Sequence, residues 1–249
     1  MSQKTILITG GSRGIGRAAA LLAGERGWSV GVNFARDEAA ARDVVGDIER
    51  AGGKAIALRG DVSVEEDVLS IFDDAIGAFG PLNGVVVNAG VVAPTARLAD
   101  MSVERMRRIF EVNTLGAYLC AREAARRMSL SRGGRGGAIV LISSAAARLG
   151  SPGLYVDYAG SKGAIDTLNA GLSKELGPEG VRVNAIRPGL IETDIHASGG
   201  EPERARVLGA TAPMGRAGTA AEVGEAIVWL LSDAASYVTG AILDVTGGR

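Results

Sequence analysis

Short apolar runs recur along the chain and alternate with longer amphipathic stretches. KTILIT at residues 4–9 is such a run, and so is LNGVVVNAG at residues 82–90. Strands that are apolar on both faces are typical of a parallel sheet that helices cover on both sides. The predicted strands cover residues 4–9, 28–34, 54–60, 82–90, 137–144, 181–189 and 241–247.

The stretches between these strands carry apolar residues at helical spacing. One of them starts with Ser63 and Glu66, whose spacing is typical of a capping box. The alternation of strands and helices predicts a single α/β domain over residues 1–249. Residues 190–216 have only a weak pattern, and a long polar segment of this kind indicates a lid or a disordered loop. The predicted helices cover residues 15–27, 37–52, 63–80, 102–131, 157–177 and 219–233.

Composition and charge narrow the classes of protein. The chain has 249 residues, of which 47% are hydrophobic and 22% charged, and its net charge is −1. This balance is that of a soluble globular protein, and no positive field attracts nucleic acid or an anionic membrane. MSQKTILITGG has no signal-peptide layout, and no apolar run approaches the ~20 residues of a membrane span. We expect a cytoplasmic protein without a nucleic-acid or membrane partner.

Glycines between the first strand and its helix predict a nucleotide site. In TGGSRGIG (9–16), Gly10 allows a tight turn, Gly14 lets backbone approach a phosphate, and Gly16 allows close helix–strand packing. The helix N-terminus then faces a pyrophosphate. The glycines alone also fit an ordinary strand–helix turn, but the strand–turn–helix context favours a dinucleotide.

Charges beyond the second strand bear on which dinucleotide binds. That strand ends VNFARDE, with Asn33 and Arg36 at the turn, and Arg13 lies in the glycine loop. Guanidinium groups bind a ribose 2′-phosphate well, which predicts NADP(H), with NAD(H) as the alternative cofactor. If Arg36 is a solvated residue and Asp37 an N-cap, the preference stays open.

Two tyrosines lie in SPGLYVDYAGSKGA, at residues 151–164, and Tyr158 has Lys162 four residues further on. Residues at this spacing share one helix face. Lowering a phenol pKa from about 10 to about 7 takes about 4 kcal/mol, which an ammonium about 4 Å away supplies at a dielectric of about 20. Tyr155 has Ala159 at that position instead. Taken alone, the pair also fits a half-buried aromatic and a solvated lysine.

The motifs in combination are more specific than any one of them. The chain carries, in order, TGGSRGIG, DV at 61–62, NAG at 88–90, Asn113, ISS at 142–144, YAGSK at 158–162 and PGLIET at 188–193. Over its whole length it resembles the short-chain dehydrogenase/reductase family, in particular bacterial sugar-dehydrogenase-like and β-ketoacyl-carrier-protein-reductase-like members. The resemblance implies a single-domain Rossmann-type doubly wound parallel sheet and hydride transfer between nicotinamide C4 and a carbonyl or alcohol carbon.

The resemblance also implies catalytic roles. Tyr158 is the expected general acid/base, and Lys162 is expected to lower its pKa and to hold the nicotinamide ribose. Ser144 is expected to hydrogen-bond the substrate oxygen. Asn113 is expected to place a water that links Lys162 to solvent.

Further residues are implied as cofactor contacts. Asp61 and Val62 are expected at the adenine, residues 88–90 at the adenosine ribose, and residues 188–193 at the carboxamide. We predict no metal ligands, because the single cysteine, Cys120, cannot form a disulfide or a cysteine metal site. The predicted cofactor contacts are Gly10, Ser12, Arg13, Gly14, Ile15, Gly16, Asn33, Arg36, Asp61, Val62, Asn88, Ala89, Gly90, Tyr158, Lys162, Pro188, Gly189, Ile191 and Thr193.

The sequence departs from the family pattern at two motifs. Val87 stands where the family often has a first asparagine, and Asn88 remains. The family serine usually lies thirteen residues before the tyrosine, but that position is Ala145, and Ser144 lies fourteen before Tyr158. One extra residue, absorbed at SPG, explains the offset. Ser143 is the rival, but adjacent strand residues point to opposite faces.

Competing functions remain. A β-ketoacyl carrier-protein reductase would present a basic face, and the arginines before the fifth strand suit that face or a solvated helix end. A non-catalytic nucleotide sensor would lack part of the Tyr/Lys/Ser set. We interpret His196 as an exposed loop residue and Cys120 as a small buried one. The family also implies a homotetramer built through helices 102–131 and 157–177 and the last strand. The four arginines are Arg126, Arg127, Arg132 and Arg135.

Overall fold

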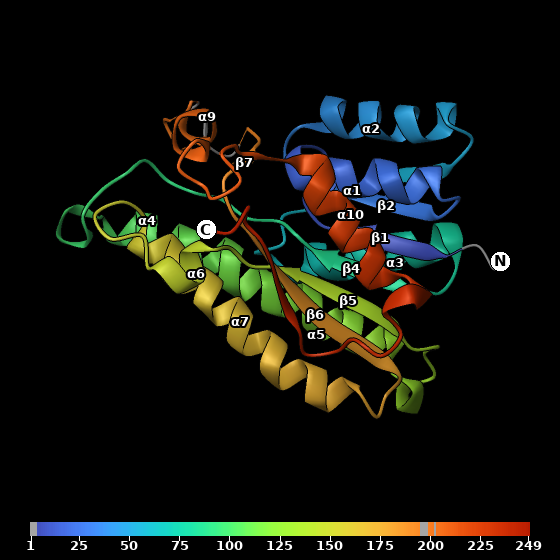
Figure 1. Cartoon of the computed structure of the whole chain (residues 1–249). Helices are drawn as coiled ribbons and strands as arrows, with labels where there is room; N and C mark the ends of the chain where they lie inside the picture. Colours follow the sequence, from blue (N-terminus) through green and yellow to red (C-terminus); the bar gives the residue numbers. More distant parts are fainter. Residues whose placement is uncertain (1–3, 195–198, 202) are drawn as a thin grey trace.

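A parallel sheet forms the centre of the molecule in the computed structural model, which describes residues 4–194, 199–201 and 203–249 (Figure 1). Its seven strands lie in the order β3-β2-β1-β4-β5-β6-β9. This confirms the predicted doubly wound parallel sheet. The strands are β1 (Thr5–Ile8), β2 (Ser29–Phe34), β3 (Lys54–Arg59), β4 (Gly84–Val87), β5 (Gly137–Ile142), β6 (Val181–Pro188) and β9 (Ile242–Val245).

Helices cover both faces of this sheet. Figure 1 shows α1, α2 and α10 along one face and α3, α5 and α7 along the other. Val223 and Ile227 of α10 pack with Ala19 of α1 in one buried core, and Phe72 of α3 lies in the other. The helices on these faces are α1 (Gly14–Glu25), α2 (Glu38–Arg50), α10 (Ala220–Leu231), α3 (Glu65–Phe79), α5 (Ala117–Met128) and α7 (Val156–Leu176).

The strand order reverses beside β1, and this places the site. β1 pairs with β2 through Thr5 and Ser29, and with β4 through Ile6 and Gly84. The segments that follow β1 and β4 therefore leave the sheet toward opposite faces. Ligands of open α/β sheets bind in the crevice at such a point, outside the carboxyl ends of the strands.

The helical pattern predicted over residues 102–131 corresponds to several helical segments. The structure has α4 (Val103–Phe110), a π-helical segment η2 (Glu111–Gly116) and then α5. A Cβ added at Gly116 would lie 2.9 Å from the Val62 side chain and 3.0 Å from its carbonyl oxygen. A widened turn of this kind is frequent at functional sites, and this one contains Asn113.

The predicted capping box at Ser63 and Glu66 is also wrong. Helix α3 begins after Val64, and the Ser63 hydroxyl donates to Asp61 Oδ1 at 2.6 Å. The Ser63 side chain therefore forms a local hydrogen bond with Asp61 and does not cap the helix.

The described part of the segment between β6 and α10 forms a separate two-stranded sheet. Its strand β7 (Ile191–Glu192) pairs with β8 (Gly218–Thr219), and α9 (Arg204–Gly209) lies between them. Within the described residues, no helix is long and apolar enough to cross a membrane. The prediction for His196 falls outside the described residues.

Candidate active site

Two connected cavities form one cleft at the carboxyl ends of the strands. The larger, about 690 Å³, lies along the glycine loop, and the smaller, about 180 Å³, lies at Tyr158. The two cavities share the lining residues Ile15, Gly90 and Thr193, so they adjoin each other. Of the predicted site residues, only Gly16 and Asn113 are outside the linings. The residues brought together are Gly10, Ser12, Arg13, Gly14, Ile15, Asn33, Arg36, Asp61, Val62, Asn88, Ala89, Gly90, Ser144, Tyr158, Lys162, Pro188, Gly189, Ile191 and Thr193.

The glycine loop has the shape that a dinucleotide phosphate requires. Gly10 and Gly14 have φ angles of +61° and +54°, which side-chain-bearing residues rarely adopt. A Cβ on Gly16 would lie 2.3 Å from the Gly10 carbonyl oxygen, so only glycine fits this helix start. The Asn88 side chain fixes the same turn by donating to Gly10 O at 3.0 Å. The loop therefore fits a nicotinamide dinucleotide.

Asn33 organises this loop with its side chain. It is 2% exposed, and its Oδ1 accepts from Gly10 N at 3.1 Å. Its Nδ2 donates to Leu58 O at 3.2 Å and to Gly60 O at 3.0 Å. Asn33, which we predicted as a cofactor contact, therefore links β2, β3 and the glycine loop through hydrogen bonds of its side-chain amide.

The wall beyond β2 carries the charges that bear on the cofactor. The Asp37 carboxylate accepts from Ala40 N at 3.0 Å and caps α2, as the alternative interpretation of this turn expected. Arg13 and Arg36 line the larger cavity, and neither forms an ion pair within the described residues. Two guanidinium groups without an acidic partner in the described ranges therefore border the cavity here.

Asp61 also lines the larger cavity. Burial raises the pKa of its carboxyl, but hydrogen bonds from Ser63 and the ion pair with Arg108 outweigh burial and lower it. Arg108 Nη2 lies 3.2 Å from Asp61 Oδ2. No motif points to Arg108, because it comes from α4, and only the packing of α4 beside the end of β3 brings it here.

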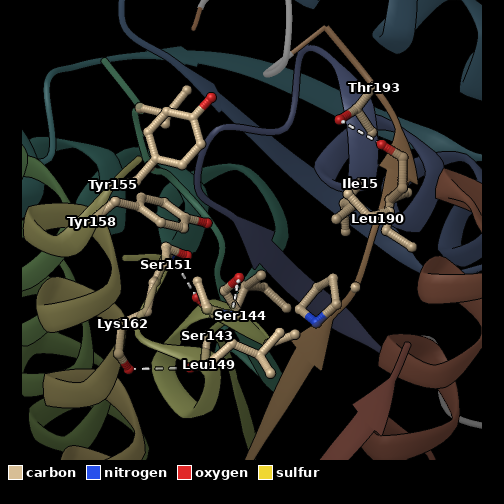
Figure 2. Close-up of a pocket in the computed structure, with 18 of the residues that line it drawn as sticks. Ile15, Ser143, Ser144, Leu149, Ser151, Tyr155, Tyr158, Lys162, Leu190 and Thr193 are labelled. Atoms are coloured by element: carbon tan, nitrogen blue, oxygen red, sulfur yellow. Dashed lines mark hydrogen bonds between the residues drawn. The ribbon is translucent and has the colours of Figure 1, made fainter. Parts of the chain in front are cut away.

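Tyr158 and Ser144 meet in the smaller cavity. Figure 2 shows the Tyr158 ring below Tyr155 and above Ser144, with Ile15 and Leu190 across the cavity. Burial raises the pKa of the Tyr158 phenol, and its hydrogen bond with Ser144 lowers it in part. Ser143 is 2% exposed and donates to Lys162 O at 3.1 Å, away from the phenol. Of the two serines, Ser144 contacts Tyr158.

Lys162 is buried beneath this pair. Its Nζ donates to Ile142 O at 2.8 Å and lies 5.8 Å from the centroid of the Tyr158 ring. Burial lowers the pKa of the lysine itself to about 8. The Lys162 ammonium therefore lies beside the Tyr158 ring and is held by a backbone carbonyl.

Asn113 holds the loop after β4. Its Oδ1 accepts from Val91 N at 2.8 Å, and its Nδ2 donates to Val91 O at 2.9 Å. A Cβ on Gly90 would lie 3.4 Å from both Asn113 Oδ1 and Lys162 Nζ, so the two side chains flank this glycine. The Asn113 side chain therefore lies next to Lys162, with its amide bound to protein.

A cluster that the motifs do not contain completes the smaller cavity. The Tyr155 hydroxyl donates to Glu201 Oε2 at 3.1 Å, and the Arg204 guanidinium lies 5.1 Å from the centroid of its ring. Tyr155 and Arg204 line the cavity. In the sequence, the only sign of this cluster was the position of Tyr155, three residues before Tyr158. Its partners lie too far along the chain for spacing to reveal them.

A cleft for a dinucleotide at the reversal of strand order, ending at a Tyr–Ser–Lys group, defines a nicotinamide-dependent oxidoreductase. A family model described as "Enoyl-(Acyl carrier protein) reductase" matches residues 10–249. The chain belongs to the short-chain dehydrogenase/reductase family and is an NAD(P)-dependent enzyme that acts on a small molecule.

Relatives match over almost the whole chain. The uncharacterized oxidoreductase YgfF of Escherichia coli is 52% identical, over 98% of each chain. The L-rhamnose 1-dehydrogenase (NAD(P)(+)) of a Sphingomonas strain is 39% identical, over 98% of this chain and 95% of that one. The solved structure of a mutant short-chain dehydrogenase/reductase of Serratia marcescens has a TM-score of 0.90 at 31% identity, over 98% of this chain and 97% of that one.

Proposed function

We propose that this enzyme transfers hydride between NADP(H) and a carbonyl or secondary alcohol of a sugar, polyol or small ketone. One observation carries the proposal: Ser144, Tyr158 and Lys162 meet at the end of the cleft that the glycine loop lines. Bound nicotinamide supplies or accepts the hydride at the substrate carbon.

The side chains have distinct proposed roles. Tyr158 donates its hydroxyl proton to the carbonyl oxygen in reduction and accepts the alcohol proton in oxidation. Ser144 hydrogen-bonds the same oxygen and polarises it. Lys162 holds the nicotinamide ribose, and η2, with Asn113, holds a water that connects the lysine to solvent.

The pKa of the Tyr158 phenol bears on both directions of this reaction. Because burial keeps the Tyr158 phenol protonated, the protein alone presents a proton donor, as carbonyl reduction requires. Oxidation needs the phenolate, which a positive charge bound next to the ring would stabilise. The oxidised nicotinamide carries such a charge.

NADP(H) is proposed because of Arg13 and Arg36. Both line the cavity beyond β2 without an ion pair in the described part of the chain, whereas Asp37 is engaged as a helix cap. A 2′-phosphate matches such guanidinium groups. An NADPH-dependent aldehyde reductase-like protein of Arabidopsis thaliana is 37% identical over this whole chain and 94% of its own.

The remaining cofactor contacts follow the cleft. The glycine loop, with Ser12 and Ile15, would hold the pyrophosphate. Asp61 and Val62 would hold the adenine, and residues 88–90 the adenosine ribose. The carboxamide would be held by Pro188, Gly189, Ile191 and Thr193.

Reduction of a carrier-bound β-ketoacyl group is the second candidate. The description of the matching family model shares only the carrier protein with this candidate, since it names an enoyl and not a β-ketoacyl group. Two of the four arginines of the basic face, Arg126 and Arg127, are paired with Glu123. Turnover of a carrier-linked thioester, lost on neutralising Arg132 and Arg135, would replace the sugar or polyol proposal. A non-catalytic nucleotide sensor is disfavoured by the complete Tyr/Ser/Lys group.

We also propose a cytoplasmic homotetramer whose single domain carries a substrate lid at residues 190–216. Exposed apolar side chains support two interfaces. Phe110 and Tyr118 lie on α4 and α5, at 43% and 40% exposure. Trp229 lies on α10 and Leu243 on the C-terminal strand β9, at 39% and 36% exposure.

The Tyr158→Phe variant tests the function, with Tyr155→Phe as the matched control. Loss of an acid/base group typically lowers kcat by about 10²–10⁴-fold, and we expect this for Tyr158→Phe at unchanged NADPH affinity. Tyr155→Phe should raise KM for the carbonyl substrate and keep kcat within a few-fold. Turnover of a panel of sugars, polyols and ketones measures both. Wild-type kcat in Tyr158→Phe would overturn the proposed chemistry.

A further inference from the structure

An ion pair joins the helix of Tyr158 to α4. Arg105 Nε lies 2.8 Å from Asp157 Oδ2, and Arg105 Nη2 lies 3.2 Å from Asp157 Oδ1. The Asp157 side chain is 1% exposed and that of Arg105 is 15% exposed. This is a two-bond fork between planar groups, the geometry that fixes an arginine and a carboxylate relative to each other.

The Asp157 side chain that pairs with Arg105 also contacts Tyr158 directly. Its Oδ1 also accepts from the Tyr158 backbone N at 2.9 Å, in the first turn of α7. Helix α7 begins without a side-chain cap on Tyr155, its N-cap residue. The Asp157 carboxylate therefore satisfies an amide of this first turn and holds the residue whose phenol enters the cavity.

Arg105 reaches the cofactor cleft as well. Its Nη1 donates to Pro94 O at 2.5 Å, and its side chain lines the larger cavity. The loop that carries Pro94 is held at Val91 by Asn113 and at Ala96, whose N donates to Leu154 O at 3.0 Å. One guanidinium thus contacts the loop along the cleft and the helix start of Tyr158.

Stability alone is a weak reason for such a pair. Burying two charges is costly, and replacing a buried ion pair by apolar side chains is often neutral or stabilising. A fork that joins two walls of one cleft has a second consequence, because it fixes the distance between them. Small misplacements of reacting groups lower rates strongly.

We propose that Arg105 and Asp157 are positioning residues for hydride transfer: their ion pair sets Tyr158 relative to the loop along the cofactor cleft. The inference rests on the proposed function of Tyr158. It assigns neither residue a contact with the reacting atoms.

Kinetics of Asp157→Asn, Arg105→Gln and the double variant test this pair. We expect kcat to fall about tenfold in each single variant, with the Kd for NADPH unchanged within about threefold. Residues that act as one unit are not additive, so the double variant should be no slower than the slower single variant. Arg105→Lys keeps the charge and the folded state but lacks the fork, so it should keep the melting temperature and still lose kcat.

Glu123→Gln is the matched control. Glu123 is 2% exposed and accepts from Arg127 Nε at 2.6 Å, so it is a buried carboxylate in an arginine pair outside the cleft. We expect a lower melting temperature and wild-type kcat. Wild-type kcat in Arg105→Lys and in the other variants that fold would overturn the positioning role. So would a more than tenfold weaker NADPH Kd at unchanged kcat, which would make Arg105 a cofactor contact. An active Tyr158→Phe, in contrast, would overturn the proposed function itself.

Discussion

The two ends of the cleft are built in different ways. At the glycine loop, the turn that faces the cleft is made by backbone without side chains, since Gly16 has no room for a Cβ and Gly10 has a positive φ. The side chains of Asn33 and Asn88 act there by holding this backbone in place. At the reacting end, position is set by buried polar side chains, with Lys162 at 4% exposure and Asn113 at 1%. In the proposed function, the first end binds a constant group, whereas the second holds groups that change protonation state.

This difference predicts opposite relations between stability and function. A glycine in a tight turn serves binding and packing together, so changing it should harm both. A buried lysine whose pKa is lowered to about 8 is desolvated at the expense of stability. The reacting end should therefore gain stability when its chemistry is removed.

The largest effect is expected for Gly16→Ala, which tests the first end. The added Cβ would lie 2.3 Å from Gly10 O and 2.6 Å from Asn88 Nδ2, so the loop must move. We expect NADPH affinity to fall more than about 100-fold and the free energy of unfolding to fall by about 3 kcal/mol. Fluorescence titration and urea denaturation measure these quantities.

Gly46→Ala is the control for that substitution. Gly46 lies in α2 with nothing within 4 Å of an added Cβ. It should raise the free energy of unfolding by up to about 1 kcal/mol and leave NADPH affinity unchanged. Equal behaviour of the two alanine variants would contradict the account of the loop.

The second prediction tests the reacting end with Lys162→Met. The folded-state pKa is about 8 against an ordinary 10.5, so the unfolded chain binds more protons between these values and wild-type stability should rise with pH there. Lys162→Met should be inactive, yet more stable at pH 7 by about 2 kcal/mol after loss of one hydrogen bond. The gain should shrink toward pH 10. Denaturation at several pH values measures it, and a variant less stable than wild type at pH 7 would contradict the prediction.

The smallest effect is expected for Arg36→Ala, which refines the first end. Loss of one arginine–phosphate contact should weaken NADPH binding about tenfold and leave NADH binding unchanged. Arg42→Ala is the control, since Arg42 is exposed on α2 and pairs with Glu38. Parallel titrations with both cofactors measure the ratio. An equal loss of affinity for NADPH and NADH would show that Arg36 does not bind the 2′-phosphate.

Local patterns predicted the elements well and the polar contacts less well. The strands were predicted to within a few residues because they are apolar runs bounded by turn residues. The capping box at Ser63 was wrong because Asp61, two residues earlier, competes for the hydroxyl. The helical pattern at 102–131 did not reveal the widened turn at η2, because Gly116 and Asn113 of that turn contact Val62 and Val91 from other segments.

By itself, the sequence determined the alternation that makes a parallel sheet, the glycine turn after β1, and the helix that places Tyr158 and Lys162 on one face. These features depend on neighbours along the chain, where apolar periodicity and backbone geometry act. Only the tertiary structure decided which serine meets the phenol, that Asn33 and Asn113 bind backbone, and that Arg105 joins Asp157 to Pro94. Such contacts join residues far apart in the chain, and their direction and burial are fixed only when the helices pack on the sheet.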